Sequence, residues 1–162
     1  MKKTLSLFLS LILVLTTFVG TAVTASAATI EDLEFTLNSD GTSYSVTGCV
    51  EGISGDVVIP STYNGLPVKS ISCGVFYGIK GIENVEIQEG IESIDREAFM
   101  WSTIESVTIP DSVEIIGSNA FSGTRLKSVK LPFNLKALGG WAFYGCNNLK
   151  SIEIPEGVTV LE

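Results

Sequence analysis

Histidine is absent from this 162-residue chain, and its absence bears directly on catalysis. Without histidine there can be no Ser-His-Asp or Cys-His nucleophilic site and no His-Glu-x-x-His zinc site, and the commonest general base is missing. The chain also lacks the Gly-x-Ser-x-Gly, Cys-x-x-Cys, phosphate-binding-loop and dinucleotide-binding motifs. The sequence therefore predicts a protein that is not an enzyme and that has no cofactor or metal site.

Basic residues are scarce as well. The chain has 10 Lys and Arg against 18 Asp and Glu, a net charge of −8. Without Lys2 and Lys3 at the extreme N-terminus, eight basic residues remain and the net charge is −10. Nucleic acids and anionic membranes are bound by dense Lys and Arg, so we expect no nucleic-acid partner. The acidic surplus favours solubility instead.

Long apolar runs are limited to one, from Leu5 to Val19. It follows Lys2 and Lys3 and precedes the small-residue stretch 25–27, Ala-Ser-Ala, an order typical of a secretory signal peptide cleaved after Ala27. The run is shorter than the roughly 20 residues that span a bilayer, which argues against a retained anchor. We therefore predict that residues 1–27 are a signal peptide, that the rest does not insert into a membrane, and that the protein is secreted or at the cell surface.

An internal repeat of 22 or 23 residues organises the rest of the chain. Phenylalanine recurs at that spacing after Val or Ala, as Val75-Phe76, Ala98-Phe99, Ala120-Phe121 and Ala142-Phe143. Each pair precedes an aliphatic L-x-x-L-x-L pattern: Ile82, Val85, Ile87; Ile104, Val107, Ile109; Leu126, Val129, Leu131; Leu149, Ile152, Ile154. This pattern at this period is the strand motif of a leucine-rich repeat, in which alternate apolar side chains enter the core.

We therefore predict a leucine-rich-repeat solenoid of the α/β horseshoe type, rich in strand and poor in helix, with a parallel sheet of about four strands. A proline follows most of the strands and ends the ladder, because it has no N–H to donate. A short second extended stretch, such as Val113 to Ile116, comes next. Gly117, Gly139 and Gly140 are expected to supply flexible turns before the Ala-Phe unit, which we interpret as about one turn of α-helix or 3₁₀-helix.

The two ends of the array differ. Residues 33–37 alternate as a strand, residues 38–41 read Asn-Ser-Asp-Gly, and residues 44–47 form a second strand, which predicts an N-terminal β-hairpin cap over residues 28–55. The Asn-Ser-Asp-Gly stretch also matches part of a calcium loop, but a hairpin turn is favoured because the other ligands are missing. The leucine-rich repeats occupy residues 56–162. Their last repeat is incomplete and has no C-terminal cap, so we expect the chain to be a fragment.

Three cysteines leave two possibilities open. In an oxidising compartment at most one internal disulfide can form, and Cys49 and Cys73 lie in neighbouring segments of the expected array. The alternative is that they are small buried thiols. Cys146 stands where the preceding repeat has Thr124, which indicates core packing.

Two units, residues 109–121 (IPDSVEIIGSNAF) and 126–132 (LKSVKLP), closely resemble the BspA-like leucine-rich repeats of bacterial surface proteins. Residues 58–68 (VIPSTYNGLPV) resemble the longer first repeat of that family, and the likeness extends over about residues 56–162. The Asn or Cys of standard leucine-rich repeats is missing. The resemblance implies an exported protein, often longer than this one, that adheres to proteins of a host or of a neighbouring cell.

Candidate binding residues do not lie on the predicted sheet, whose outward rows are small or mixed in charge. The carboxylates Glu92, Asp95 and Glu97 also fall at outward positions and indicate a solvated face. Large side chains instead flank the Ala-Phe units at positions that are Gly or polar in sister repeats: Tyr77, Met100, Trp101, Trp141 and Tyr144. They predict a lateral surface that binds extracellular proteins. Two alternatives stay open. These residues pack loop against loop, or the chain is a structural spacer repeat in a larger multidomain surface protein whose activity lies beyond residue 162.

Overall fold

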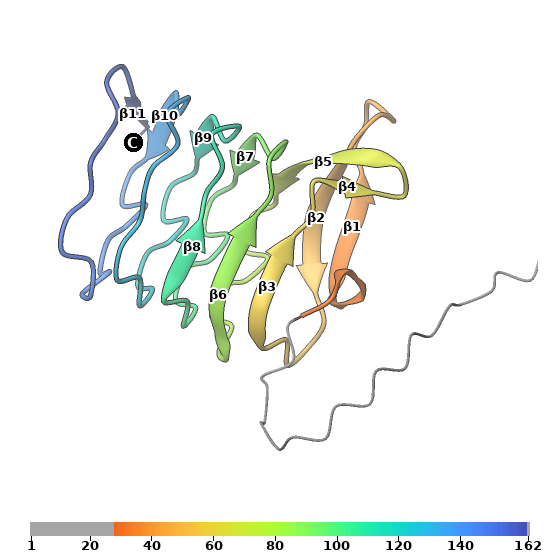
Figure 1. Ribbon diagram of the computed structural model, residues 1–162, viewed down its shortest axis with the longest axis horizontal. Helices are drawn as coiled ribbons and strands as arrows, with labels where there is room; N and C mark the ends of the chain where they lie inside the picture. Colours follow the sequence, from red (N-terminus) through yellow and green to blue (C-terminus); the bar gives the residue numbers. More distant parts are fainter. Residues whose placement is uncertain (1–27, 162) are drawn as a thin grey trace, which may run out of the picture.

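The computed structural model describes residues 28–161, so the predicted signal peptide lies outside it. The chain coils into turns stacked along one axis, as the repeat predicts, and each wall of the stack carries a β-sheet (Figure 1). In the described part the only helical element is a 3₁₀ turn, η1 (Ile30–Asp32). The protein is therefore a strand-rich solenoid with parallel sheets. At the Ala-Phe unit, where a turn of helix or 3₁₀ is expected, the chain forms successive hydrogen-bonded turns instead.

The first sheet contains the L-x-x-L-x-L strands. It consists of β3 (Gly55–Ile59), β6 (Ile82–Ile87) and β8 (Ser106–Thr108), all parallel. The equivalent stretches of the next two turns, residues 126–131 and 149–154, continue this wall without being strands. The backbone N–H groups of Arg125 and Lys127 still donate hydrogen bonds to the preceding turn, to the carbonyl oxygens of Ile104 and Glu105 at 3.0 and 3.1 Å. Two of the four L-x-x-L-x-L stretches are thus regular strands, β6 and β8, and β3 precedes them as the third strand of the sheet.

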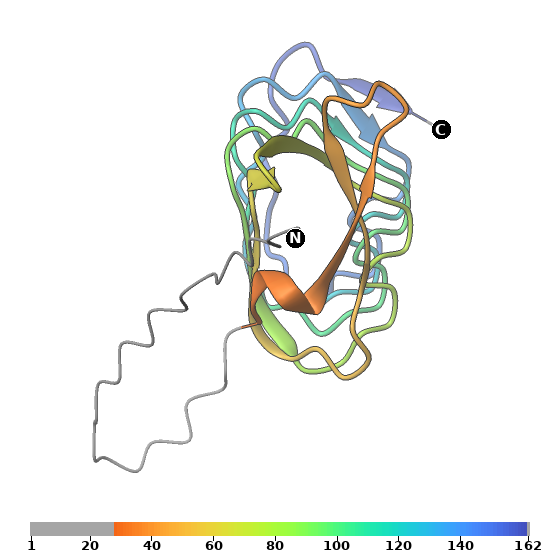
Figure 2. The same cartoon turned by 90° about the vertical axis from the view of Figure 1, so that its right-hand side faces the viewer.

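The second sheet is the larger one, although the sequence predicts it only as a short extended stretch. From β2 onward its strands pair in parallel in the order β2 (Tyr44–Cys49), β5 (Leu66–Ile71), β7 (Ser93–Ile94), β9 (Ile115–Ile116), β10 (Ala137–Gly139) and β11 (Thr159–Leu161). The short strand β4 (Thr62–Tyr63) adds antiparallel to β5. Seen along the axis, successive turns lie behind one another as a flattened ring (Figure 2).

The N-terminal hairpin lies across one end of this stack (Figure 2). Its strand β1 (Leu33–Leu37) pairs antiparallel with β2, and β2 continues into the second sheet through β5. In the turn, the Asp40 carboxylate accepts hydrogen bonds from the Thr42 backbone N–H at 2.8 Å and the Ser43 hydroxyl at 3.1 Å. These bonds, led by the one from Thr42, lower the pKa of Asp40. The residues that resemble a calcium loop therefore make a side-chain-stabilised turn.

The core is organised around a stack of phenylalanines. The rings of Phe76, Phe99, Phe121 and Phe143 lie nearly parallel, with centroids 4.9, 5.2 and 5.3 Å apart along the stack. The Phe99 N–H donates to the carbonyl oxygen of Ala120 at 2.8 Å, and the Phe121 N–H repeats the bond to Ala142. Since this spacing is close to that of neighbouring β-strands, every turn sits one strand width above the last.

Gly117 and Gly139 have a different role from the flexible turns expected of them. A Cβ atom on Gly117 would lie 2.5 Å from the Arg96 backbone nitrogen, and one on Gly139 would lie 2.1 Å from that of Ser118. Neither glycine has a positive φ. They are required because the backbone of one turn approaches the backbone of the preceding turn too closely for a side chain.

All three cysteines are free thiols in the structure. The half-buried Cys49 thiol donates to the Val75 carbonyl oxygen at 3.5 Å, while Cys73 is exposed. Burial, together with the Glu34 carboxylate, raises the pKa of Cys49 and favours its protonated form. Cys146 is buried, with its sulfur 3.2 Å from the Thr124 hydroxyl of the preceding turn, which is the core role that the Thr-Cys correspondence indicates.

Candidate functional site

The Ala-Phe unit of each turn is flanked by two residues with left-handed backbone. They are the residues two before and two after the phenylalanine, and their φ angles lie between 58° and 71°. The first position is filled by Gly74, Glu97, Asn119 and Trp141, and the second by Gly78, Trp101, Gly123 and Gly145. Only glycine adopts this conformation freely, because a Cβ atom crowds the following carbonyl oxygen.

Both tryptophans of the chain occupy left-handed positions. Trp101 stands where its three sister turns have glycine, and Trp141 stands where the others have Gly, Glu or Asn. A left-handed residue other than glycine costs about 1–2 kcal/mol. Strain of this kind persists only when the surroundings hold it, and it is concentrated at functional sites. The two tryptophans are therefore candidate functional residues.

A groove of about 390 Å³ lies between them on the lateral face of the solenoid. Its lining consists of Met100, Trp101, Asn119, Ser122, Trp141 and Tyr144. The large side chains come from the turns that carry Phe99 and Phe143, whereas the turn between them contributes only Asn and Ser. The groove is thus a gap left by one turn with small residues between two turns with large ones.

The structure brings four of the five predicted binding residues into this groove. Trp101 is 51% exposed, and Trp141 and Tyr144 are 74% and 71% exposed, so these aromatic rings are not covered by neighbouring loops. Tyr77 does not line the groove but contacts Trp101, with ring centroids 5.5 Å apart at a tilt of 58°. The loop-against-loop packing considered as an alternative is therefore present for the Tyr77–Trp101 pair.

Trp101 is held over the following turn. A Cβ atom on Gly123 would lie 2.2 Å from Cδ1 of Trp101, so the indole ring covers that glycine. On the other side Tyr77 supports the ring, and the Lys80 ammonium donates to the Trp101 carbonyl oxygen at 2.5 Å. Trp101 is therefore fixed in orientation although half of its surface faces solvent.

Two polar side chains that sequence reasoning missed, Asn119 and Ser122, complete the groove. Ser122 is only 2% exposed, and within the described chain no hydrogen bond occupies its hydroxyl or the Asn119 side-chain amide, although their backbone groups pair with each other at 3.0 Å. They stand at the same repeat positions as Met100 and Trp141. The signal that could have identified Asn119 and Ser122 is that they are small residues at repeat positions where other turns have large ones.

The carboxylates show no arrangement suited to acid–base or metal chemistry. Glu92 pairs with Lys69, Glu97 with Arg96 at 3.6 Å, and Asp95 accepts from Ser93. Among residues 28–161, no three His, Cys, Asp or Glu side chains are grouped as metal ligands would be. No helix in the same range is long and apolar enough to cross a membrane.

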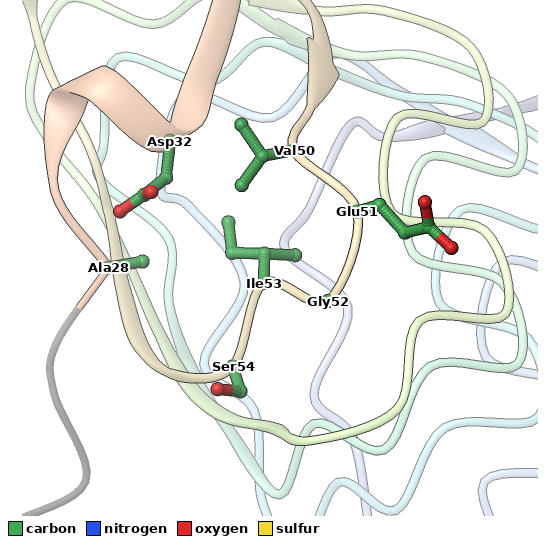
Figure 3. Close-up of a pocket in the computed structure, with 7 residues that line it drawn as sticks. All are labelled: Ala28, Asp32, Val50, Glu51, Gly52, Ile53 and Ser54. Carbon is green, nitrogen blue, oxygen red and sulfur yellow. The ribbon is translucent and has the colours of Figure 1, made fainter.

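Two other hollows are less suited to recognition. One of about 300 Å³ lies beside the hairpin, where Val50 and Ile53 lie between Asp32 and Glu51, and the Glu51 carboxylate points away from the other side chains (Figure 3). The other, of about 650 Å³, is lined by the C-terminal turns and includes Phe133, which is 82% exposed. Phe133 was not predicted from the sequence, although it stands after Pro132 where sister turns have Asp, Ser or Glu.

The stacked turns, the phenylalanine column and the strand motif define a leucine-rich repeat protein. The chain belongs to the BspA type leucine rich repeat family, which it matches over residues 56–162 in six copies. This match confirms the family resemblance carried by the repeat units. No curated protein matches the chain.

Solved structures of bacterial leucine-rich repeat proteins share the fold. A T. pallidum leucine rich repeat protein is 24% identical, with a TM-score of 0.76 over 84% of this chain and 64% of that one. The pneumococcal vaccine antigen PcpA is 17% identical, with a TM-score of 0.63 over 80% of this chain and 38% of that one. A Eubacterium ventriosum leucine-rich repeat protein is 22% identical, with a TM-score of 0.58 over 82% and 38% of the two chains. This chain thus spans less than two thirds of the length of these proteins.

Proposed function

We propose that this protein is a non-catalytic binding module, exported to the cell surface or the medium, that attaches to extracellular proteins of a host or of a neighbouring cell. The observation that carries the proposal is the pair of exposed tryptophans held in left-handed positions around the groove. Tryptophan and tyrosine are the side chains that most often dominate the energy of a protein interface. Exposed aromatic rings without such a role would cost solubility and stability together.

Export is supported by the N-terminal sequence and by the family. Basic residues, an apolar run and Ala-Ser-Ala at residues 25–27 have the order of a signal peptide. Other chains with these repeats include bacterial surface proteins, and the family resemblance extends over residues 56–162. The absence of histidine and the paired carboxylates favour binding over catalysis.

A second function, that of a structural spacer, is favoured by the outer face of the first sheet. Its strand rows pair Asn84 with Ser106 and Glu86 with Thr108, and neither row contains an aromatic anchor. A solenoid with such a face can hold another domain at a distance without contacting any partner. In the binding module the two tryptophans contact a partner, whereas in the spacer they contact none.

The test measures binding of the full chain to a panel of purified extracellular proteins by surface plasmon resonance. The experimental variant replaces both groove tryptophans, Trp101→Ala with Trp141→Ala. The control is Phe133→Ala, which removes an even more exposed aromatic ring that lies outside the groove. We expect the double variant to weaken binding by at least about tenfold and the control to leave it unchanged.

Two results would count against the binding module. If no protein of the panel binds at micromolar concentration, the spacer is the better description. If binding occurs and the double variant retains it, the groove is not the contact surface. Circular dichroism of each variant establishes that the solenoid is folded before binding is compared.

A further inference from the structure

The two walls of the groove come from turns that are not neighbours in the stack. Trp101 and Met100 belong to the turn of Phe99, and Trp141 and Tyr144 to the turn of Phe143, two turns away. The phenylalanine rings beneath them step by 5.2 and then 5.3 Å, about 10.5 Å in all. The Trp101 indole reaches from its own turn over Gly123 of the middle turn, and Asn119 and Ser122 of that turn form the floor between it and the Trp141–Tyr144 wall.

This aromatic and uncharged lining fits a polyproline II segment. Proline-rich segments in this conformation dock in aromatic-lined grooves, against which their flat rings pack. We propose that the groove binds a proline-rich, uncharged segment of a protein partner, with proline rings against Trp101 and against the Trp141–Tyr144 wall. This inference rests on the proposed protein-binding function and names the chemistry of the partner.

The polar groups of the floor match the same occupant. A polyproline II segment forms no internal hydrogen bonds, so its carbonyl oxygens are free to accept, and its prolines have no N–H to satisfy. The groove supplies donors in the Ser122 hydroxyl and the Asn119 side-chain amide, neither of which is already bonded within the described chain. Its lining has no charged side chain, and therefore selects an uncharged segment.

Other peptide conformations fit less well. An α-helix with its side chains is about 10–12 Å across, so a single turn of about 5.4 Å fills more space than the groove's volume of about 390 Å³. Addition of a β-strand needs unpaired backbone groups at a sheet edge. Here the backbone is already used, since the N–H groups of Trp101 and Gly123 donate to the Ser122 and Tyr144 carbonyl oxygens at 2.8 and 2.7 Å. An extended segment that contributes side chains and carbonyls is the occupant that remains.

The groove is also organised in advance of binding. Trp101 lies between Tyr77 and Gly123, so its ring loses little freedom when a ligand stacks on it. A polyproline II segment is likewise stiff before it binds. Low ordering costs on both sides favour affinity from a small contact area.

The chain supplies its own probe, because its two tryptophans are both in the groove. The full chain is titrated with a proline decamer while tryptophan fluorescence is recorded with tryptophan-selective excitation. The decamer contains no aromatic residue, so any change comes from the protein. We expect a saturable spectral shift, and a weakening of binding by about tenfold in Trp101→Ala, where Trp141 still reports.

Three further arms decide the outcome. A glycine-serine decamer, uncharged and flexible, is expected to give no shift, and Phe133→Ala is expected to bind the proline decamer as the unchanged protein does. Ser122→Ala keeps the shape of the floor and is expected to weaken binding several-fold through loss of one hydrogen bond.

The inference is overturned if the glycine-serine decamer binds as well as the proline decamer, or if neither binds. It is also overturned if a linear glucose oligosaccharide shifts the tryptophan spectrum and the proline decamer does not, which would assign the groove to carbohydrate. Tryptophan-dependent binding of a panel protein without decamer binding would leave the proposed function standing and remove only the proline specificity.

Discussion

The phenylalanine column and the lateral groove are both aromatic, yet they follow opposite rules. The column repeats without exception, with Phe76, Phe99, Phe121 and Phe143 stacked within 7° of parallel. In the groove no aromatic position is repeated from one turn to the next, and two of its rings sit on backbone better suited to glycine. Repetition marks what every turn needs in order to stack, and departure from repetition marks what one turn does alone.

The largest effect is expected from removing a ring of the column. Phe99 is completely buried between two other rings, and Phe99→Ala should lower the free energy of unfolding by about 3–5 kcal/mol, since it loses burial and leaves a cavity. Urea denaturation followed by circular dichroism measures the change. The exposed Phe133 is the matched control, and Phe133→Ala should stay within about 0.5 kcal/mol. Equal losses in the two variants would break the contrast between column and surface.

A smaller loss of stability is expected at Gly123, the repeat glycine that lies under the Trp101 ring. Gly123→Ala adds a Cβ atom that would meet the Trp101 ring and also strains a left-handed residue, whereas Gly78→Ala, at nearly the same φ, has open space around the new atom. Both should lose about 1–2 kcal/mol from the backbone, and Gly123→Ala should lose more and shift the tryptophan fluorescence. If the two variants are equally stable and spectrally alike, Trp101 does not rest on Gly123.

The strain at Trp101 can be isolated by two substitutions that both remove the ring. Trp101→Gly and Trp101→Ala lose the same contact with Tyr77, but only glycine accepts a φ of 60° freely. The glycine variant should therefore be more stable than the alanine variant by about 1 kcal/mol. Thermal denaturation of both variants measures the difference. If Trp101 had ordinary helical or extended backbone, the glycine variant would instead be the less stable of the two, and that result would show that the strain is absent.

The smallest effect is expected from the exposed charges that join neighbouring turns. A hydrogen bond and the charge of Lys127 lower the pKa of Glu105. A carboxyl whose pKa is lower in the folded state stabilises the fold above its unfolded pKa, and this contribution is lost as the pH falls through the folded value. Glu105→Gln should make the acid side of the stability curve slightly shallower and leave ligand binding unchanged. A marked loss of stability at neutral pH would contradict this, because exposed pairs contribute little.

The parts of the fold that repeat could be predicted from the sequence. The spacing of the phenylalanines and the L-x-x-L-x-L pattern located the first wall and the column, and the Asp-Gly turn located the hairpin. The second sheet was underestimated because β7 and β9 are only two residues long and too short for alternation to show. Gly117 and Gly139 looked like turn residues, since a close approach of two backbones leaves no trace in a single sequence.

The candidate site was predicted only in part, for a physical reason. Comparison of sister turns singled out the large residues Met100, Trp101, Trp141 and Tyr144, but not the small Asn119 and Ser122 that create the space between them. A groove needs large side chains in its walls and small side chains in its floor, and small side chains attract no notice in a sequence. The left-handed backbone of both tryptophans, which gives the site its interest, depends on the conformation of the whole turn and became visible only in the structure.

The turns stack along the long axis of the solenoid (Figure 1), and backbone hydrogen bonds join each turn to the next, which has a mechanical consequence. A pulling force applied along that axis loads and breaks the hydrogen bonds of one inter-turn layer at a time, so the turns separate one after another. The groove spans three turns and therefore two such layers, since its two walls belong to turns on either side of the floor. A ligand seated in it would clamp those layers together, so occupation of the groove should raise the force at which this part of the chain unravels.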